Sequence, residues 1–237
     1  MNKKRLIISL LAIITVVGAI VGSYVYRDTI YSRIARTAAV VSGQEIKPLL
    51  NSEGRYIRQI VAQDNSTSRT IMWQSDSSEA DAVIEYRLAG SENTQTIGAT
   101  DKAFTDDGST TYIHEGTLTG LTPNTKYEYR VGYGSDRRSD WYSLETAGAS
   151  VYDVLIYPDS QSGDYSQWEE IVKDSAHRNP RTALYISMGD LVDNGEQDYQ
   201  WRTWLNSIRP LSANVPLATT LGNHEMYTLD WKMREPY

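Results

Sequence analysis

This sequence of 237 residues contains no cysteine. That absence excludes a disulfide framework and thiolate chemistry, and it leaves the cellular compartment open. Basic residues are in the minority, because 23 Lys and Arg stand against 30 Asp and Glu, for a net charge of −7. A general nucleic-acid binder needs a basic stripe, so we expect no nucleic-acid partner. Phenylalanine is nearly missing as well: one Phe accompanies 17 Tyr, a composition that suits half-exposed β surfaces.

One long uncharged run stands at the N-terminus, from residue 6 to residue 26. As a helix it would span roughly 31 Å, which is about the thickness of the hydrocarbon layer of a bilayer. The basic residues Lys3, Lys4 and Arg5 precede it and predict that the N-terminus stays inside. We therefore interpret residues 1–27 as a retained signal anchor or a cleaved signal peptide.

The two alternatives differ in what reaches the outside. An anchor would hold the chain to the membrane through the N-terminal helix, whereas cleavage near the small residues 17–19 would release it. In both cases everything beyond about residue 27 is exported to the extracytoplasmic side. Residues 28–54 mix charged, small and glycine residues, and we interpret them as a stalk between the membrane helix and the first domain.

Short segments with alternating apolar and polar residues follow the stalk. They comprise residues 69–74, 82–88, 111–118 and 126–134, separated by polar stretches rich in Ser, Gly, Asp and Asn. Period-two alternation at such spacing predicts an all-β sandwich over residues 55–148.

The stretch around Tyr127 makes the sandwich more specific. Leu121 and Pro123 lead into Tyr127 at the start of a late strand, which is the arrangement of a tyrosine corner, and Trp73 would be the core aromatic residue. The segment resembles a fibronectin type III domain. In particular, "LTGLTPNTKYEYRVG" and "SDWYSLETA" are similar to the N-terminal sandwich of purple acid phosphatases.

The pattern changes after residue 150. The continuous apolar run 151–157 predicts a strand buried on both faces of a parallel sheet, and the runs 182–188 and 216–221 predict two more. Helical patterns lie between these runs. This order, β-α-β-α-β, predicts an α/β domain over residues 151–237.

The two predicted helices each have one apolar face. The first has Asp164 as a candidate cap and ends near Pro180. Its expected inward face consists of Trp168, Ile171, Val172 and Ser175. The second covers residues 198–208, and its expected inward face consists of Trp201, Trp204, Leu205 and Ile208.

Each of the three strands ends in a polar turn. Asp159 follows the first, Asp190 the second, and Asn223 with His224 the third. Because parallel strands place their C-terminal ends on one edge of the sheet, these side chains should converge. Their oxygen atoms could hold divalent or trivalent metal ions, with Asp190 as a bridge between two of them. Two such ions can bind a phosphate and generate hydroxide near neutral pH.

The turns "DSQ", "GDLVDNG" and "GNHE" resemble the first three motifs of calcineurin-like metallophosphoesterases, which include the purple acid phosphatases. The resemblance implies that Asp159 binds the first metal, that Asp190 bridges both, and that Asn223 binds the second. It also implies that His224 contacts the substrate phosphate or protonates the leaving group, oriented by Asp193. The two ions would be iron, manganese or zinc, with their identity open.

Three departures from the family pattern matter. Gln161 stands where the first motif usually has a histidine, and Asp193 occupies the position of the tyrosine ligand of purple acid phosphatases. Asn194 replaces the arginine of phosphoprotein phosphatases. Gln161 could bind an ion through its amide oxygen or through a water, but we rather expect Gln161, like Asn194, to support the ligands. The two later histidine motifs of the family are absent from this sequence.

We therefore expect an exported, metal-dependent phosphoric-ester hydrolase, either a phosphatase or a phosphodiesterase, whose substrate is a phosphate ester. The chain would hold only the first half of its α/β domain, would stop midway through it, and would be inactive on its own. Its last strand, 216–221, should then be an unpaired edge with an uncovered apolar face. The alternative is a cell-surface binding module, in which the sandwich binds and the metallophosphoesterase remnant is not catalytic.

Overall fold

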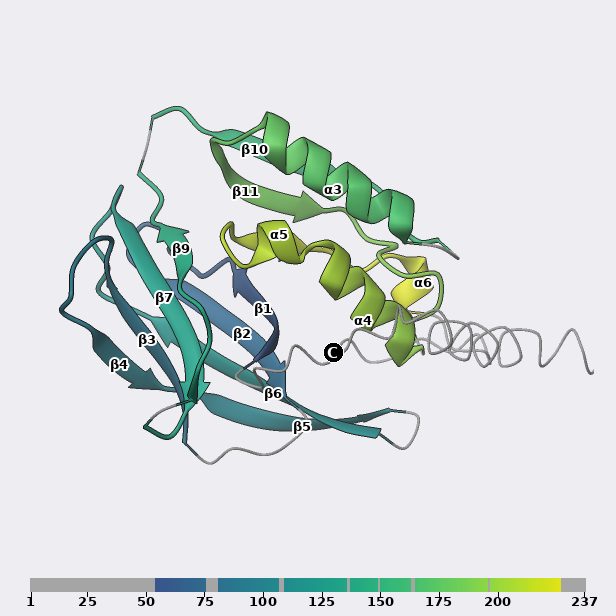
Figure 1. Cartoon of the computed structure of the whole chain (residues 1–237). Helices are drawn as coiled ribbons and strands as arrows, with labels where there is room; N and C mark the ends of the chain where they lie inside the picture. The colour runs from purple at the N-terminus through teal and green to yellow at the C-terminus, as the bar shows by residue number, and fades with distance from the viewer. Residues whose placement is uncertain are drawn as a thin grey trace, which may run out of the picture. The chain divides into compact units, whose positions relative to one another are not determined.

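The computed structural model describes residues 54–75, 81–106, 109–135, 137–148, 150–162, 165–195 and 197–226. Within them, a β-sandwich is followed by an α/β layer (Figure 1). The predicted membrane segment 1–27 lies outside the described residues, and so does the predicted stalk up to residue 53. In the part of the chain that the structure describes, no helix combines the length and the apolar character that a membrane span requires.

The sandwich consists of antiparallel strands in two sheets. On one side the order is β1 (Arg55–Ile60), β2 (Arg69–Ser75), β6 (Ser109–Leu118) and β5 (Thr100–Asp106). On the other side it is β4 (Gln95–Gly98), β3 (Ala82–Leu88), β7 (Lys126–Tyr133) and β8 (Arg137–Arg138), with β9 (Tyr142–Glu145) also paired to β7. The alternation read from the sequence is therefore real, because every second residue of β2 is buried.

The core of the sandwich confirms two predictions. Trp73 is fully buried among Ile71, Ile84 and Val131. The tyrosine corner is present as well, since the Thr122 N–H donates to the Tyr127 hydroxyl at 3.0 Å.

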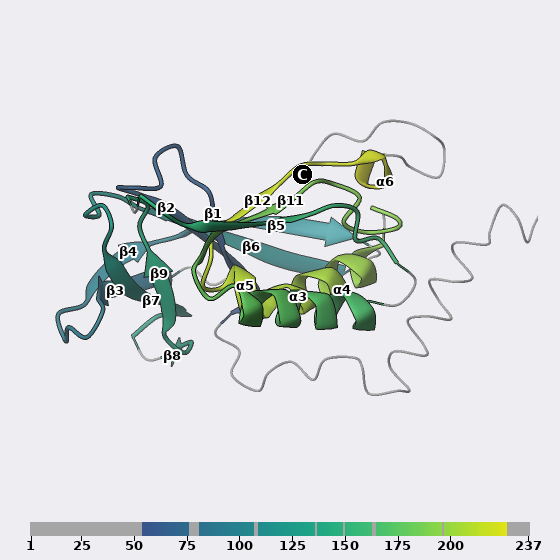
Figure 2. The ribbon, with the colours of Figure 1, turned by 90° about the horizontal axis from the view of Figure 1, so that it is seen from above.

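The α/β part follows the predicted order of strands and helices. It consists of β10 (Asp153–Tyr157), α3 (Ser166–Arg178), β11 (Thr182–Ser187), α4 (Asp198–Ser207), α5 (Arg209–Ser212), β12 (Leu217–Thr219) and α6 (Asn223–Met226). The strands β10, β11 and β12 are parallel neighbours. The helices α3, α4 and α5 lie along one face of the sheet (Figure 2). The core between helices and sheet includes Tyr157 and Tyr185 from the strands and Trp168, Val172 and Trp204 from the helices.

The prediction that β10 is buried on both faces is wrong. Val154 is 36% exposed and Ile156 is 61% exposed, whereas Tyr157 is buried. The helices cover only one face of the sheet, so alternate residues of β10 point to a face that nothing in the described residues covers. On α3, the predicted inward residue Ile171 is 53% exposed, while Trp168 and Val172 are buried as expected. Asp164, the predicted cap, lies outside the described residues.

The last strand is not the unpaired edge that the sequence predicts. Besides β11, β12 pairs in parallel with β1 of the sandwich, with Ile60 opposite Leu217. One sheet therefore runs in the order β10-β11-β12-β1-β2-β6-β5 through both parts of the chain.

A buried polar contact strengthens the joint between the two parts. The backbone carbonyl of Ala213 accepts a hydrogen bond from Gln59 Nε2 at 3.0 Å and one from the Tyr129 hydroxyl at 2.7 Å. Gln59 also donates to the Ser143 carbonyl and accepts from Arg69. Since an unsatisfied buried amide or hydroxyl costs free energy, these bonds make the joint specific to one arrangement.

Candidate metal centre

The three polar turns meet at one edge of the sheet. The last residues of the three parallel strands lie level, because Tyr157 is opposite Ser187 and Ser187 is opposite Thr219. Asp159, Asp190 and Asn223 follow these strand ends by a few residues each. The arrow of β11 in Figure 1 points to this edge, where α6 also lies. The topology thus brings together the three turns that the sequence singles out.

Asp190 is the residue through which the three turns are joined. Its backbone carbonyl accepts the N–H groups of Ser160 and Gln161, both at 2.9 Å. Its Oδ1 accepts the N–H of His224 at 2.9 Å. The first and third turns are therefore both hydrogen-bonded to the second, one through the backbone and one through the carboxylate.

The backbone at Asp190 is in an uncommon conformation. Its φ angle is 47°, in the left-handed region that non-glycine residues rarely adopt. The neighbouring Gly189 has φ 98°, and a Cβ atom there would lie 2.7 Å from the N atom of Gly222. A Cβ atom on Gly222 would in turn overlap the Asp190 carboxylate. There is therefore a steric reason for glycine at both positions beside this site.

Glu225 is one of two residues that support the turns of this site and that sequence reasoning missed. Its side chain is buried, and its carboxylate accepts four backbone N–H groups, those of Asp190, Leu191, Val192 and Gly222, at 2.7 to 3.0 Å. The only signal in the sequence is its place in "GNHE". A glutamate is normally exposed, so its burial could not be expected from residue type.

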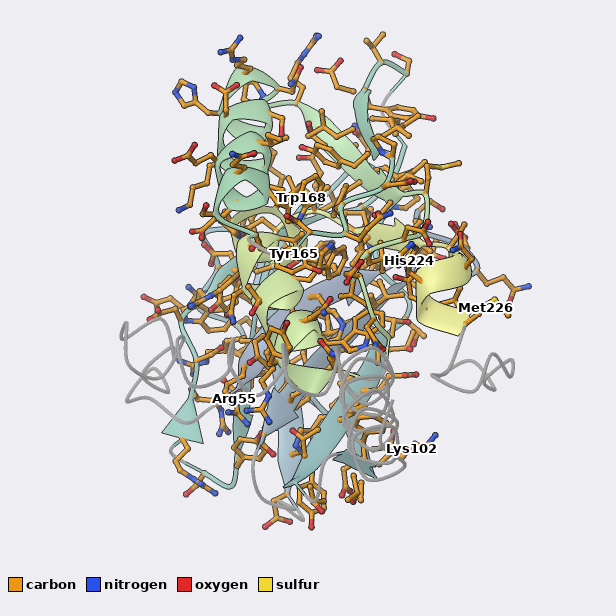
Figure 3. All side chains as sticks on the ribbon, turned by 90° about the vertical axis from the view of Figure 1, so that its right-hand side faces the viewer. Arg55, Lys102, Tyr165, Trp168, His224 and Met226 are labelled. Atoms are coloured by element: carbon orange, nitrogen blue, oxygen red, sulfur yellow. The ribbon has the colours of Figure 1, made fainter. Side chains whose placement is uncertain are left out.

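His224 lies on α6 (Figure 3), and its ring contacts Asp193 through the backbone carbonyl of that residue. Its Nδ1 lies 2.7 Å from the backbone carbonyl of Asp193 and 3.7 Å from the carboxylate Oδ1. The carbonyl can only accept, so Nδ1 is the donor and Nε2 is left for other partners. This hydrogen bond raises the pKa of His224 above its usual value, partial burial opposes the rise, and the charges of Asp190, Asp193 and Glu225 add to it.

The second turn is supported from behind by α4. The Oε1 of Gln200 accepts the N–H groups of Asp193 and Asn194 at 2.7 and 3.2 Å, and Trp201 donates to the carbonyl of Gly195. Gln200 is buried, and the sequence provides no signal for this role. These bonds from α4 satisfy backbone groups of the turn, in addition to the burial of Leu191 and Val192 within it.

The first turn carries two oxygen-bearing side chains with free capacity. Asp159 is exposed, and no hydrogen bond engages its carboxylate within the described part of the chain. The Oε1 of Gln161 is buried and has no hydrogen-bond partner there, which is unusual for a buried polar atom.

The donor set fits a hard cation in kind. Asp159, Asp190, Asn223 and Gln161 supply carboxylate and amide oxygens, the ligands that Mn²⁺ and related ions accept. Across the described ranges, no group of three or more His, Cys, Asp and Glu side chains is gathered closely enough to hold a metal. The set therefore offers few protein ligands to each ion.

Comparisons with known families agree with this organisation. Residues 56–146 match the family model described as purple acid phosphatase, N-terminal domain. Residues 139–237 match the model described as calcineurin-like phosphoesterase, a family that normally binds two metal ions.

Among curated proteins, the purple acid phosphatase of Glycine max is 29% identical over 124 residues, which cover 49% of this chain and 26% of that protein. The "Probable inactive purple acid phosphatase 1" of Arabidopsis thaliana is 28% identical over 136 residues, which cover 48% of this chain and 22% of that protein. The chain thus matches less than a third of the length of these relatives.

Among solved structures, the purple acid phosphatase PPD1 from yellow lupin (Lupinus luteus) seeds superimposes with a TM-score of 0.64 at 21% identity. The match covers 74% of this chain and 36% of that one. At this level of identity the likeness concerns the fold, which combines a sheet-rich N-terminal domain with a metallophosphoesterase-like α/β domain.

Proposed function

Because this chain belongs to the calcineurin-like metallophosphoesterases of the purple acid phosphatase type, we propose that its three joined turns are the first part of the active site of a metal-dependent phosphoric-ester hydrolase. The observation that carries the proposal is the level ending of β10, β11 and β12, with the turns that follow tied together through Asp190. Ligand sites of α/β sheets lie at this edge.

The proposal assigns one role to each oxygen-bearing side chain. Asp159 and Asn223 would each hold one ion, and Asp190 would contribute to the binding of both. The Oδ1 of Asp190 already accepts the His224 N–H, which leaves Oδ2 and the remaining lone pairs for metal. Gln161 supports the first ion from its buried Oε1. Two ions bound there would supply Lewis-acid binding of the phosphate and a hydroxide nucleophile.

His224 would act on the substrate through Nε2. Its Nδ1 is held by the Asp193 carbonyl, so the ring orientation is fixed without use of the other nitrogen. A ring with a raised pKa keeps its proton more readily, which suits a contact to phosphate or a general acid for the leaving group. Asp193 contributes through its backbone and through its negative charge, rather than through a side-chain hydrogen bond.

A second candidate function is a binding module with a non-catalytic metallophosphoesterase part. This candidate is supported by the name of the Arabidopsis relative, which contains the word "inactive". The departures at Gln161, Asp193 and Asn194 favour it too, since each removes a group that active relatives are expected to use. Under this second candidate function, the sandwich is the part of the chain that binds a partner.

Metal binding and turnover separate the two candidates. We expect the chain to bind Mn²⁺ weakly, D190N to weaken that binding about tenfold or more, and any hydrolysis of an aryl phosphate by the chain to require the ion. If D190N bound Mn²⁺ as tightly as the parent chain, the proposed metal site would be wrong. Bound metal without any turnover would favour the binding module.

The proposal also places residues beyond about 27 outside the cytoplasm, supported by Lys3, Lys4 and Arg5 before the apolar run 6–26. A reporter enzyme that folds only after export, fused after residue 54, should be active. Removal of the run should abolish that activity. The size of the exported product would show whether the segment is retained as an anchor or cleaved as a signal peptide.

A further inference from the structure

The buried carboxylate of Glu225 has partners of an unusual kind. All four of its hydrogen bonds come from backbone N–H groups, with Oε1 accepting from Leu191 and Val192 and Oε2 accepting from Asp190 and Gly222. Three of these amides belong to the second turn and one to the third. A carboxylate with this many backbone donors is held firmly in one position.

The four amides include the two places where the site is sterically tight. Asp190 has the left-handed backbone conformation, and Gly222 packs so closely against it that a Cβ atom would overlap its carboxylate. Conformations of this kind persist only where the surroundings hold them. Glu225 bonds to the N–H of both residues through the same oxygen atom, so it fixes their separation directly.

We propose that Glu225 is a positioning residue, which joins the second and third turns and holds the Asp190 carboxylate in place before any metal binds. The inference rests on the proposed function for the identity of the metal site, but the positioning itself depends only on the four amide contacts. It extends the roles assigned above, because Glu225 acts through Asp190 and touches neither metal nor substrate.

The substitution Glu225→Gln tests this role with little change in size. The amide keeps one acceptor oxygen but presents an NH₂ group to two backbone donors, so two of the four contacts are lost and turn repulsive. Glu225→Asp keeps the carboxylate but has a shorter side chain. This variant replaces Glu225→Gln in the test if the glutamine variant does not fold. The matched control is Glu170→Gln, an exposed glutamate on α3.

The first measurement is hydrogen exchange of the metal-free chain. We expect the amides of Asp190, Leu191, Val192 and Gly222 to exchange faster in the Glu225 variants than in the parent chain and in Glu170→Gln. The strands β2 and β3 should keep their protection, which separates loosened turns from general unfolding. Unchanged exchange at the four amides would overturn the inference, whatever the metal does.

The second measurement is the affinity for Mn²⁺. It is determined from the electron paramagnetic resonance signal of the free ion, at a temperature well below the melting temperature of each variant. We expect Glu225→Gln to bind about 10- to 100-fold more weakly than Glu170→Gln. Equal affinities in variants that remain folded would overturn the positioning role. If the parent chain itself binds no Mn²⁺, the proposed metal site fails, and the exchange measurement alone still decides on Glu225.

Discussion

At the scale of single residues, the contact between His224 and Asp193 changes what mutagenesis should show. The ring bonds to the backbone carbonyl, which no side-chain substitution removes. We therefore predict that Asp193→Asn retains the tautomer of His224 with the proton on Nδ1. Long-range ¹H–¹⁵N NMR at a pH where the ring is neutral measures the tautomer directly. A switch to the Nε2 tautomer in Asp193→Asn would show that the carboxylate, at 3.7 Å, orients the ring after all.

Glu85 provides a pH-dependent prediction away from the site. It pairs with Arg138 and Arg130 on the sandwich, both at 2.7 Å. Burial alone would raise the pKa of Glu85, but the hydrogen bonds and charges of the two arginines outweigh it, so the pKa is lowered from 4.5. A lowered folded-state pKa means that the stabilisation is present above the unfolded-state value and is lost as the pH falls through the folded-state value.

We accordingly predict that Glu85→Gln lowers the free energy of unfolding by on the order of 1 kcal/mol at neutral pH. The difference from the parent chain should shrink between about pH 6 and pH 3, as the parent glutamate becomes protonated. Urea unfolding at several pH values measures this. Glu92→Gln, at an exposed position, is the control that should show no such trend. A difference that stays constant with pH would mean that packing, not charge, causes the effect.

The sequence predicted where the three polar turns lie better than it predicted the side chains that hold those turns in place. Asp159, Asp190 and Asn223 follow apolar strands, and the rule that parallel strands end on one edge is enough to place them. Glu225 and Gln200 could not be found in this way. Both side chains accept hydrogen bonds from backbone N–H groups that come together only when the turns fold. Judged by residue type alone, a glutamate and a glutamine would be expected on the surface.

At the scale of elements, α3 offers a matched pair of neighbouring aliphatic residues. Val172 is fully buried against the sheet, whereas Ile171 is 53% exposed. We predict that Val172→Ala lowers the free energy of unfolding by about 2 kcal/mol and that Ile171→Ala changes it by less than about 0.5 kcal/mol. Chemical denaturation of the two variants is the measurement. Similar losses would indicate that the outer side of α3 is covered in solution.

The same helix shows where sequence periodicity is accurate and where it fails. Trp168 and Val172 are four residues apart and define the buried stripe correctly. Ile171 is apolar too, but it lies about 100° around the helix from Val172, and the sheet does not reach that far. The strand β10 was misjudged for a related reason, because an apolar run cannot tell one covered face from two.

At the scale of the whole molecule, the shared sheet should make the two parts unfold together. Ile84 lies in the sandwich core, far along the chain from β11. We predict that Ile84→Val, which costs about 0.5–1.5 kcal/mol, shifts the urea midpoints of β3 and β11 equally in pulse-labelling hydrogen exchange. If β11 kept the parent midpoint, the pairing of β1 with β12 would not couple the two parts.

The order of the two domains follows from the sequence, but the joint between them does not. Changes in hydrophobic period place the sandwich before residue 148 and the α/β strands after residue 150. Nothing in the pattern of β1 marks it as the partner of β12. Both strands are short, β1 mixes apolar and polar residues without a distinctive feature, and any edge strand could have been covered in another way. The contacts of Gln59 and Tyr129 with Ala213 specify the pairing, and they are visible only after folding.

The sheet shared by sandwich and α/β layer also bears on how such chains can be recombined. A β-sandwich domain is usually treated as a unit that can be moved between proteins. If the chain were divided near residue 150 and the two parts were separated, β1 and β12 would each lose a neighbouring strand. Gln59 and Tyr129 would also lose the Ala213 carbonyl that accepts a hydrogen bond from both. A transplanted sandwich from this chain would therefore have to bring β12 with it, or be redesigned along β1.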